Sequence, residues 1–376
     1  MSAHLVDRDT SARLMARALE LAERGWGRVQ PNPMVGAVLA QEGEVVGEGW
    51  HAEFGGPHAE IAALEAAGER ARGATMYVSL EPCAHDGKTP PCTRAILSAG
   101  VSALVYGAND PHPRAAGGAA LLRAAGLVVQ GPVAAPEVRA QNAAFFHAFG
   151  SDRPFVALKL AVSLDGRLGR PGEETPVTGA EARAAVHTLR AGYGAIVVGS
   201  GTALADDPEL TARGDVVPAA PPVRAVLASR CALDPSAKLF ASGAPGSAWV
   251  FCAPDADPTL RRGLEERGAR VVPVAAGDDG LNLRAVLTAL GEHPVQSVLF
   301  EGGGRVAGSL LAADLVDRLH LFVAPRIFGP DGVPAVAGPG LPLTDPGGTG
   351  RGWRVTGLRP RGSDVEIVWD RVRGEG

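Results

Sequence analysis

The sequence predicts an α/β protein with two domains. Helix and strand patterns alternate along nearly all of its 376 residues, a length that accommodates more than one core. Near residue 150, the turn-forming run Gly150-Ser151-Asp152-Arg153-Pro154 interrupts this alternation, and a strongly apolar strand follows it. We therefore expect a first domain over residues 1–150 and a second domain over residues 154–376.

The first domain is predicted to be a three-layer α/β fold. An amphipathic pattern indicates a helix near the N-terminus, and short apolar runs bounded by turn residues indicate the strands. In chain order we expect a helix at 11–23, strands at 35–39 and 44–48, a helix from His58, a strand at 74–80, a helix from Cys92, strands at 103–106 and 126–129, and a helix at 136–149.

The second domain is predicted to hold a largely parallel sheet, because helical segments separate most of its strands. The expected strands lie at 155–162, 195–198, 224–227, 248–251, 271–274, 297–300 and 319–323. Ligands of such sheets bind at the carboxyl ends of the strands.

Composition excludes several classes of function. The net charge of −5 and the lack of a basic run argue against a nucleic-acid partner. No apolar stretch reaches the roughly 18 residues of a membrane span, and the N-terminal segment, with its acidic residues, is not typical of a signal peptide. Only four cysteines occur, which favours a reducing cytoplasm over a disulfide framework.

One imidazole, two thiols and a spare carboxylate in the first domain suggest a zinc site. They are His58, Cys83 and Cys92, with Glu60 two residues beyond the histidine. A catalytic zinc takes three protein ligands and leaves one position to water. Zinc-dependent nucleobase deaminases carry H-x-E followed by P-C-x-x-C, and the glutamate moves protons between water and the leaving amine. Here eight residues separate the two cysteines instead of two, so spacing alone does not identify Cys92 as the third ligand.

Local patterns favour Cys92 as that ligand. Both His58 and Cys92 follow a proline at the start of a predicted helix, where exposed N–H groups favour a thiolate over a thiol. The alternative is that the cysteines are small buried hydrophobic residues and His58 an ordinary surface histidine. It accounts for each residue singly but not for the combination with Glu60.

Four strand ends in the second domain carry suggestive residues. The segment 301–306 is either an anion cradle leading into a helix or only a tight turn. Ser229 and Arg230 suit the extra phosphate of NADPH, or they are an ordinary solvated strand end. The segments 163–167 and 201–211 either contribute to a site or supply turn chemistry alone.

Taken together, these segments are more specific. The order GGPHAE, LEPCAHDGKTPPC, LKLAVSLDGR, GTALADDPELTAR and FEGGG closely resembles the bifunctional deaminase/reductase of riboflavin biosynthesis, from about Met15 to Phe328. The resemblance implies a cytidine-deaminase-like domain followed by a dihydrofolate-reductase-like domain, and the long spacing of the cysteines is this family's form of the site. It implies hydrolytic deamination of 2,5-diamino-6-ribosylamino-4(3H)-pyrimidinone 5′-phosphate with Zn²⁺, then NADPH-dependent reduction of the ribosyl group to ribityl.

The resemblance also implies roles for individual residues. Glu60 is the proton shuttle of the deaminase, and the zinc ligands are His58, Cys83 and Cys92. Substrate contacts of the deaminase are Asn32, His85, Lys88 and Thr89. NADPH contacts are Ala161, Thr202, Asp206, Ser229, Gly303, Gly304 and Arg305. Substrate contacts of the reductase are Lys159, Glu174, Arg190, Leu210, Arg213 and Glu301.

Three points about the reductase stay open at this stage. Arg190 and Arg213 can supply forks for a phosphate. The group that neutralises charge during hydride transfer is Lys159, Asp206 or Glu301, which the sequence does not rank. Glu174 and Pro176 occupy positions where relatives often carry a serine and a tryptophan, so contacts of that loop are in doubt.

Two other functions compete with the bifunctional enzyme. One is a zinc deaminase whose second domain is a scaffold without catalysis. The other is a nucleic-acid-editing deaminase, which the acidic charge balance disfavours. The family resemblance further implies a cytoplasmic homo-oligomer, a dimer through the reductase domain or larger, acting on a small-molecule substrate.

Overall fold

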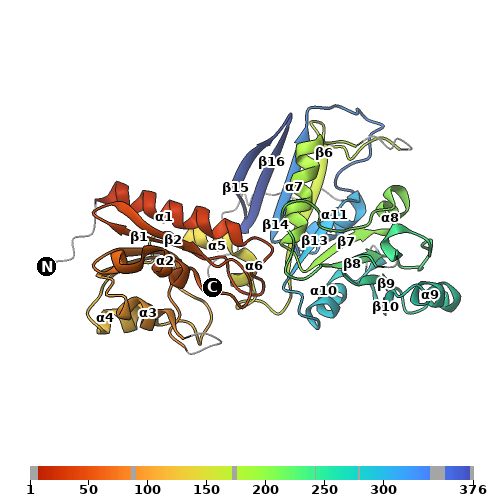
Figure 1. Ribbon diagram of the computed structural model, residues 1–376. Helices are drawn as coiled ribbons and strands as arrows, with labels where there is room; N and C mark the ends of the chain where they lie inside the picture. The colour runs from red at the N-terminus through yellow and green to blue at the C-terminus, as the bar shows by residue number, and fades with distance from the viewer. Residues whose placement is uncertain are drawn as a thin grey trace. The chain divides into compact units, whose positions relative to one another are not determined.

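The computed structural model describes residues 7–85, 90–171, 176–241, 243–277, 280–338 and 352–372. The chain divides into two compact units, Met1–Gly150 and Ser151–Gly376. Each unit has its own sheet and its own hydrophobic core, so the predicted α/β fold class is confirmed (Figure 1).

The first unit is a five-stranded sheet in the order β2-β1-β3-β4-β5. Its strands are β1 (Gly36–Gln41), β2 (Glu44–Trp50), β3 (Thr75–Leu80), β4 (Ala103–Ala108) and β5 (Val128–Gln130). Its helices are α1 (Arg8–Ala22), α2 (Ala59–Ala67), α3 (Cys92–Ser98), α4 (Gly118–Ala124), α5 (Ala135–Gln141) and α6 (Ala143–His147), with 3-10 turns η1 (Glu23–Gly25) and η2 (Gly68–Ala71). Strand β1 is antiparallel to β2 and β3, whereas β3, β4 and β5 are parallel.

The two faces of this sheet are covered by different helices. One apolar cluster joins α1 and α5 to one face, and a second cluster joins α2, α3 and α4 to the other (Figure 1). The predicted helix at 136–149 is instead two helices, because Asn142 leaves the helical conformation between them. Its side-chain amide exchanges hydrogen bonds with the backbone N–H and C=O of Met34, at 2.7 and 3.0 Å.

Helices α1 and α2 approach the sheet closely over glycine. A Cβ atom on Gly36 would lie 2.1 Å from the Ala18 carbonyl oxygen in α1. A Cβ atom on Gly49 would lie 2.4 Å from the Ala63 nitrogen in α2. Since α2 begins directly after His58, the place of this histidine depends on the bare backbone of β2.

The second unit is a nine-stranded sheet in the order β10-β9-β8-β7-β13-β6-β14-β16-β15. Its strands are β6 (Phe155–Ser163), β7 (Ala195–Gly199), β8 (Val223–Leu227), β9 (Ala248–Cys252), β10 (Arg270–Pro273), β13 (Ser297–Glu301), β14 (Arg318–Ala324), β15 (Gly352–Arg361) and β16 (Asp364–Val372). A separate short hairpin pairs β11 (Ala276–Gly277) with β12 (Gly280–Leu281). Its helices are α7 (Ala180–Ala191), α8 (Ser200–Asp206), α9 (Pro258–Glu265), α10 (Leu283–Gly291) and α11 (Gly304–Ala312), with the 3-10 turn η3 (Lys238–Phe240).

The sheet is parallel from β10 to β14 and closes with the antiparallel hairpin β15–β16. Neither hairpin of this unit was predicted. Strand β15 is the edge of the sheet and exposes many of its side chains, so it lacks the apolar run that marks the other strands.

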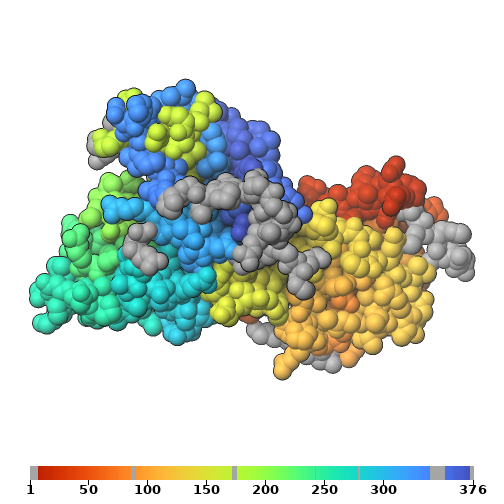
Figure 2. Space-filling model, turned by 180° about the vertical axis from the view of Figure 1, so that it is seen from behind, coloured from red at the N-terminus to blue at the C-terminus, as the bar shows by residue number. Residues whose placement is uncertain are grey.

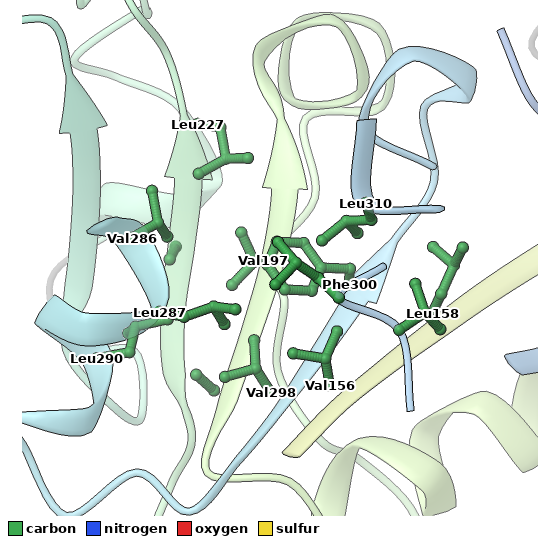
Figure 3. Close-up of a cluster of buried hydrophobic side chains, with 14 of the residues drawn as sticks. Val156, Leu158, Val197, Leu227, Val286, Leu287, Leu290, Val298, Phe300 and Leu310 are labelled. Atoms are coloured by element: carbon green, nitrogen blue, oxygen red, sulfur yellow. The ribbon is translucent and has the colours of Figure 1, made fainter. Parts of the chain in front are cut away.

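The main core of the second unit lies between the sheet and two helices. Val156, Val197 and Phe300 from three adjacent strands pack against Leu287 of α10 and Leu310 of α11 (Figure 3). Among the residues of α9, only Leu264 is buried. The helix therefore lies at the surface, in the blue-green region of Figure 2. No helix among the described residues is long and apolar enough to cross a membrane.

Replacement of Gly49 by alanine tests the close approach of α2. We expect the added Cβ to push α2 from β2 and to lower the free energy of unfolding by about 1–3 kcal/mol, as overpacking does in other cores. Chemical denaturation measures the change. Gly150→Ala is the control, because its Cβ would meet nothing within 4 Å. Equal stability of both variants would contradict the constraint.

Candidate active sites

Three predicted metal ligands converge at one end of the first unit. His58 is the N-cap residue of α2, Cys92 is the first residue of α3, and Cys83 lies in the loop after β3. One donor atom from each residue lies within 4.8 Å of the other two. The His58 Nδ1 atom is 3.3 Å from the Cys92 sulfur and 3.7 Å from the Cys83 sulfur. Tetrahedral zinc separates neighbouring nitrogen and sulfur ligands by about 3.6 Å, so the donor set fits this ion.

The thiols interact strongly with each other. The Cys92 thiol and His58 stabilise the Cys83 thiolate and lower its pKa to about 4, although burial opposes this. The backbone N–H of Cys92, at the start of α3, also donates to the Cys83 sulfur at 3.4 Å. The pKa of Cys92 is raised, because its thiol donates to Cys83 and because it is buried. These contacts favour a thiolate at Cys83, which is the form of cysteine that binds a cation.

Glu60 is a buried carboxyl group beside these ligands. It is the second residue of α2, and its side chain is only 4% exposed. Burial raises the pKa of this carboxyl above its usual range, and the charge of His58 opposes that shift in part. A carboxyl group with a raised pKa exchanges a proton more readily near neutral pH, which suits a general acid and base.

A cavity of about 320 Å³ opens beside Glu60 and the ligands. The predicted substrate contacts Asn32 and His85 both line it. The other two predicted contacts, Lys88 and Thr89, lie outside the described residues. The cavity has room for a heterocycle with a polar rim.

Sequence reasoning missed His51, which also lines the cavity. Its Nδ1 bonds to the Pro57 carbonyl oxygen at 2.9 Å, and its Nε2 bonds to the Asn32 amide nitrogen at 3.1 Å. Burial lowers the pKa of His51, so the neutral ring donates from Nδ1 and accepts the amide N–H of Asn32 at Nε2. His51 thereby orients Asn32. A signal was present in the sequence, because His51 directly follows a strand and precedes the helix of His58.

Asp110 and His112 also line the cavity, and neither residue was predicted to do so. They follow β4, whose carboxyl end is next to that of β3. Burial raises the pKa of the Asp110 carboxyl. The rule that ligands meet the carboxyl ends of parallel strands would have found both residues, had it been applied to the first domain.

In the second unit, predicted site residues gather at the carboxyl ends of parallel strands. Glu301, the last residue of β13, is paired with Lys159 of β6. Thr202 and Asp206 lie on α8 after β7, and Ser229 follows β8. Ala161 lies two residues beyond Lys159 on β6. Glu174 lies outside the described residues.

Arg190 of α7 forms a buried ion pair with Glu301. The Nε and Nη2 atoms bind the two carboxylate oxygens at 2.6 and 2.9 Å, and Nη1 donates to the Thr211 carbonyl oxygen at 3.1 Å. The Arg190 guanidinium group, which the sequence suggested as a phosphate ligand, is thus paired with Glu301. Arg213, in contrast, is 55% exposed and pairs with Glu209 at the surface, so its guanidinium reaches solvent.

Leu210, a predicted substrate contact, is a buried residue. It is 1% exposed and adopts a left-handed backbone conformation with φ of 54°. Its side chain packs in the apolar cluster that contains Val226 and Leu239. Any contact with a substrate at this position must therefore come from the backbone.

Burial distinguishes the three candidates for proton transfer. Burial lowers the pKa of the Lys159 ammonium group, and nearby Glu301 opposes this shift. The Arg190 guanidinium holds the pKa of Glu301 below its usual range, although burial alone would raise it. Asp206 is exposed. The half-buried Lys159 thus has a lowered pKa and releases a proton more easily than an ordinary lysine, whereas the pKa of the buried Glu301 is lowered by its partner Arg190.

The glycine loop after β13 forms an open helix terminus. Gly302 and Gly303 have φ of 73° and 69°, and the N-cap residue Gly303 has no side chain to accept the first N–H groups of α11. The Thr202 hydroxyl lies against this loop, 3.2 Å from the position of a Cβ on Gly302. Bare backbone N–H groups at a helix start form an anion cradle, which favours that reading over a tight turn alone. The predicted contacts Gly303, Gly304 and Arg305 all belong to it.

Comparisons with known proteins agree with this geometry. The model of the cytidine and deoxycytidylate deaminase zinc-binding region matches residues 8–108, and the model of the RibD C-terminal domain matches residues 154–365. The chain is 39% identical over 340 residues to the riboflavin biosynthesis protein RibD of Escherichia coli strain K12, covering 87% of this chain and 91% of the relative. It is 39% identical over 325 residues to the RibD protein of Aquifex aeolicus, covering 86% and 89%.

Two solved structures are also similar over nearly their whole length. RibD of Acinetobacter baumannii superposes with a TM-score of 0.79 at 31% identity, covering 98% of this chain and 100% of that one. A deaminase/reductase from Thermotoga maritima superposes with a TM-score of 0.79 at 34% identity, covering 96% and 99%. The cytidine-deaminase-like first domain and the reductase second domain are thereby confirmed.

The Arg190–Glu301 pair should contribute to stability and to its pH dependence. We expect Arg190→Gln to lower the free energy of unfolding by about 3–5 kcal/mol, because it leaves a buried carboxylate without its partner. The folded pKa of Glu301 is below the unfolded value of 4.5, so the contribution is fully present above that pH and is lost as the pH falls through the folded pKa.

Denaturant titrations between pH 3 and pH 7 measure both effects. The double variant Arg190→Gln/Glu301→Gln is the control, because it removes both charges, and it should lose less stability than the single variant. If Arg190→Gln were as stable as the wild type, the expected cost of leaving Glu301 buried without its partner would be contradicted.

Proposed function

The chain belongs to the RibD family of riboflavin-biosynthesis deaminase/reductases, and on this basis we propose that residues 1–150 carry the deaminase and residues 154–376 the reductase. The predicted resemblance is confirmed, and the chain is a bifunctional enzyme of riboflavin biosynthesis. The alternative of a non-catalytic scaffold is not favoured, because the reductase family model matches residues 154–365.

The related structure from Thermotoga maritima is named a diaminohydroxyphosphoribosylaminopyrimidine deaminase and 5-amino-6-(5-phosphoribosylamino)uracil reductase. We assign the same two substrates to this chain. The first step replaces the ring amine by a carbonyl group, and the second reduces the ribosyl side chain to ribityl. The observation that carries the first assignment is the group of three donor atoms beside the buried Glu60 in a cavity of about 320 Å³.

In the deaminase, we assign the metal ligands to His58, Cys83 and Cys92. Zinc held there would supply Lewis-acid activation of a water molecule. Glu60 takes a proton from the attacking water and delivers it to the leaving amine, a transfer that its raised pKa favours. Asn32, oriented by the neutral His51, holds the substrate in the cavity.

In the reductase, the residues that would hold the pyrophosphate of NADPH are Gly303, Gly304 and Thr202. NADPH bound there would supply the hydride. Lys159 donates the accompanying proton, since it is the candidate acid whose pKa is lowered and it pairs with Glu301 across the adjacent strands. Arg213 binds the phosphate of the substrate from the surface. The Arg190–Glu301 ion pair lies beside Lys159 and lines the base of the proposed site.

The remaining contacts complete this assignment. Ala161, Asp206, Ser229 and Arg305 would contact the cofactor, and Asn32, His85, Lys88, Thr89, Glu174 and the Leu210 backbone would contact the substrates. A cytoplasmic location, which the small number of cysteines favours, and a homo-oligomer through the reductase domain, which rests on family resemblance, belong to the same proposal.

The deaminase assignment is tested by separating metal binding from catalysis. We expect Glu60→Gln to keep one zinc ion per chain and to lower kcat for deamination by about 10²–10⁴, because the proton carrier is lost. Cys83→Ser and Cys92→Ser should lower the metal content itself. Mass-spectrometric metal counts and a deamination assay measure both effects.

Reduction of pre-deaminated substrate is the internal control, and it should persist in all three variants. Full zinc content in Cys92→Ser would show that the third ligand is elsewhere. Deamination by Glu60→Gln at the wild-type rate would remove the proton shuttle from the mechanism.

The NADPH assignment predicts a specific role for Arg230. This arginine is exposed after β8, where the turn Ser229-Arg230 carries no acidic residue. We expect Arg230→Ala to raise the Kd for NADPH by roughly tenfold and to leave the Kd for NADH unchanged, since only NADPH carries the additional phosphate.

Fluorescence of the bound dinucleotide measures both Kd values without turnover. Arg262→Ala is the matched control, because Arg262 is an exposed arginine on α9. An equal loss of affinity for both dinucleotides would mean that Arg230 does not recognise the phosphate.

A further inference from the structure

Glu81 is a buried carboxylate that the zinc chemistry does not use. It directly follows β3 and is 8% exposed. It lies two residues before Cys83 but is not one of the three clustered metal ligands. Both of its oxygens accept backbone N–H groups: Oε1 from Gly117 at 3.2 Å and Ala119 at 3.0 Å, and Oε2 from Asp110 at 3.4 Å.

These hydrogen bonds complete the start of α4. The N-cap residue of this helix is Gly117, which has φ of 95° and no side chain that could cap the helix. The first N–H groups of a helix need acceptors, and a carboxylate is favoured there by the helix dipole. Glu81 supplies that acceptor from a segment 36 residues earlier.

Further contacts join the same two segments, which we call the ligand loop (residues 81–85) and the wall loop (residues 108–118). The backbone N–H groups of Glu81 and Ala84 donate to the carbonyl oxygens of Ala108 and Ala115, at 2.9 and 3.2 Å. A Cβ on Gly118 would lie only 1.9 Å from the Pro82 carbonyl oxygen. The two loops therefore lie against each other. The Glu81 carboxylate links them by hydrogen bonds, and the rings of His85 and His112 stack between them with centroids 6.3 Å apart.

The wall loop carries part of the cavity surface. Asp110, His112 and Ala115 line the cavity, on the side formed by the carboxyl end of β4. The ligand loop carries Cys83. A change in the link between the loops would therefore move the wall relative to the metal ligands without removing a donor atom.

We propose that Glu81 is a positioning residue of the deaminase, which fixes the wall loop against the ligand loop and so sets the binding of the pyrimidine substrate. This inference rests on the proposed deaminase function. Its consequence is that loss of the carboxylate weakens substrate binding while the metal ligands stay in place.

Glu81→Gln in the full-length chain tests the inference. The amide keeps the size of the side chain but has one oxygen, so its NH₂ group faces a backbone N–H where the wild type has an acceptor. We expect one zinc ion per chain and a kcat within about threefold of the wild type. The KM for deamination should rise by about tenfold, which corresponds to the loss of one charge-assisted hydrogen bond. Glu65→Gln, on the exposed face of α2, is the matched control and should change none of these values.

Amide hydrogen exchange supplies a readout of the loop itself. In Glu81→Gln, the amides of Asp110, Gly117 and Ala119 should lose protection while those of β3 keep it. In the wild type, the deaminated product 5-amino-6-(5-phosphoribosylamino)uracil should slow exchange across residues 110–119. The wild-type measurement remains decisive if the variant does not fold.

Three results would overturn the inference: an unchanged KM in a folded variant, loss of zinc, or a wild-type wall loop whose exchange the product does not slow. A wild-type chain that neither binds zinc nor deaminates would instead refute the proposed function, before any variant is compared. The two failures are thereby distinguished.

Discussion

Three donor atoms from separate segments must meet at one point, and the first unit is built around this requirement. His58, Cys83 and Cys92 start or follow three different elements, yet their donor atoms lie within 4.8 Å of one another. Two thiolates at such a distance would repel each other, and a bound cation offsets that repulsion when both cysteines are deprotonated. The packing must therefore hold the three segments in place. Gly49 lets α2 approach β2, and the loops around Glu81 lock Cys83 against the wall of the cavity.

The second unit meets a related constraint, because it buries several charges below its candidate site. Lys159, Arg190 and Glu301 lie together on one face of the sheet, where removal from water is costly. The bidentate contact of Arg190 with Glu301 offsets much of that cost for these two residues. Lys159 has no such fork, and its pKa is lowered accordingly. The same burial thus stabilises one carboxylate as a fixed charge and leaves one amine able to give up its proton.

In the second unit, the sequence predicted the strands that carry short apolar runs, and it missed the hairpin β15–β16, which lacks such a run. The parallel strands β6, β7 and β13 were predicted because both of their faces are covered. The hairpin β15–β16 exposes one face and carries many charges, so no such run marks it. The convergence of the three candidate ligands was predicted from His58 and Cys92 at helix starts and from Cys83 at the end of a strand. The partners of His51 and Arg190 were not, because hydrogen bonds between distant segments depend on tertiary packing that no local pattern records.

Two buried glutamates in the deaminase unit show how environment decides a residue's role. Glu60 and Glu81 both line the same cavity and are similarly inaccessible. Glu81 accepts three backbone N–H groups, so both oxygens are committed to holding a loop. Burial raises the pKa of Glu60, and a carboxyl group with that property can take up and release a proton. A motif that contains two glutamates therefore does not reveal which of them performs chemistry. The surroundings of each carboxyl group distinguish the two: Glu81 accepts three backbone N–H groups, whereas the pKa of Glu60 is raised by burial beside the Cys92 thiol.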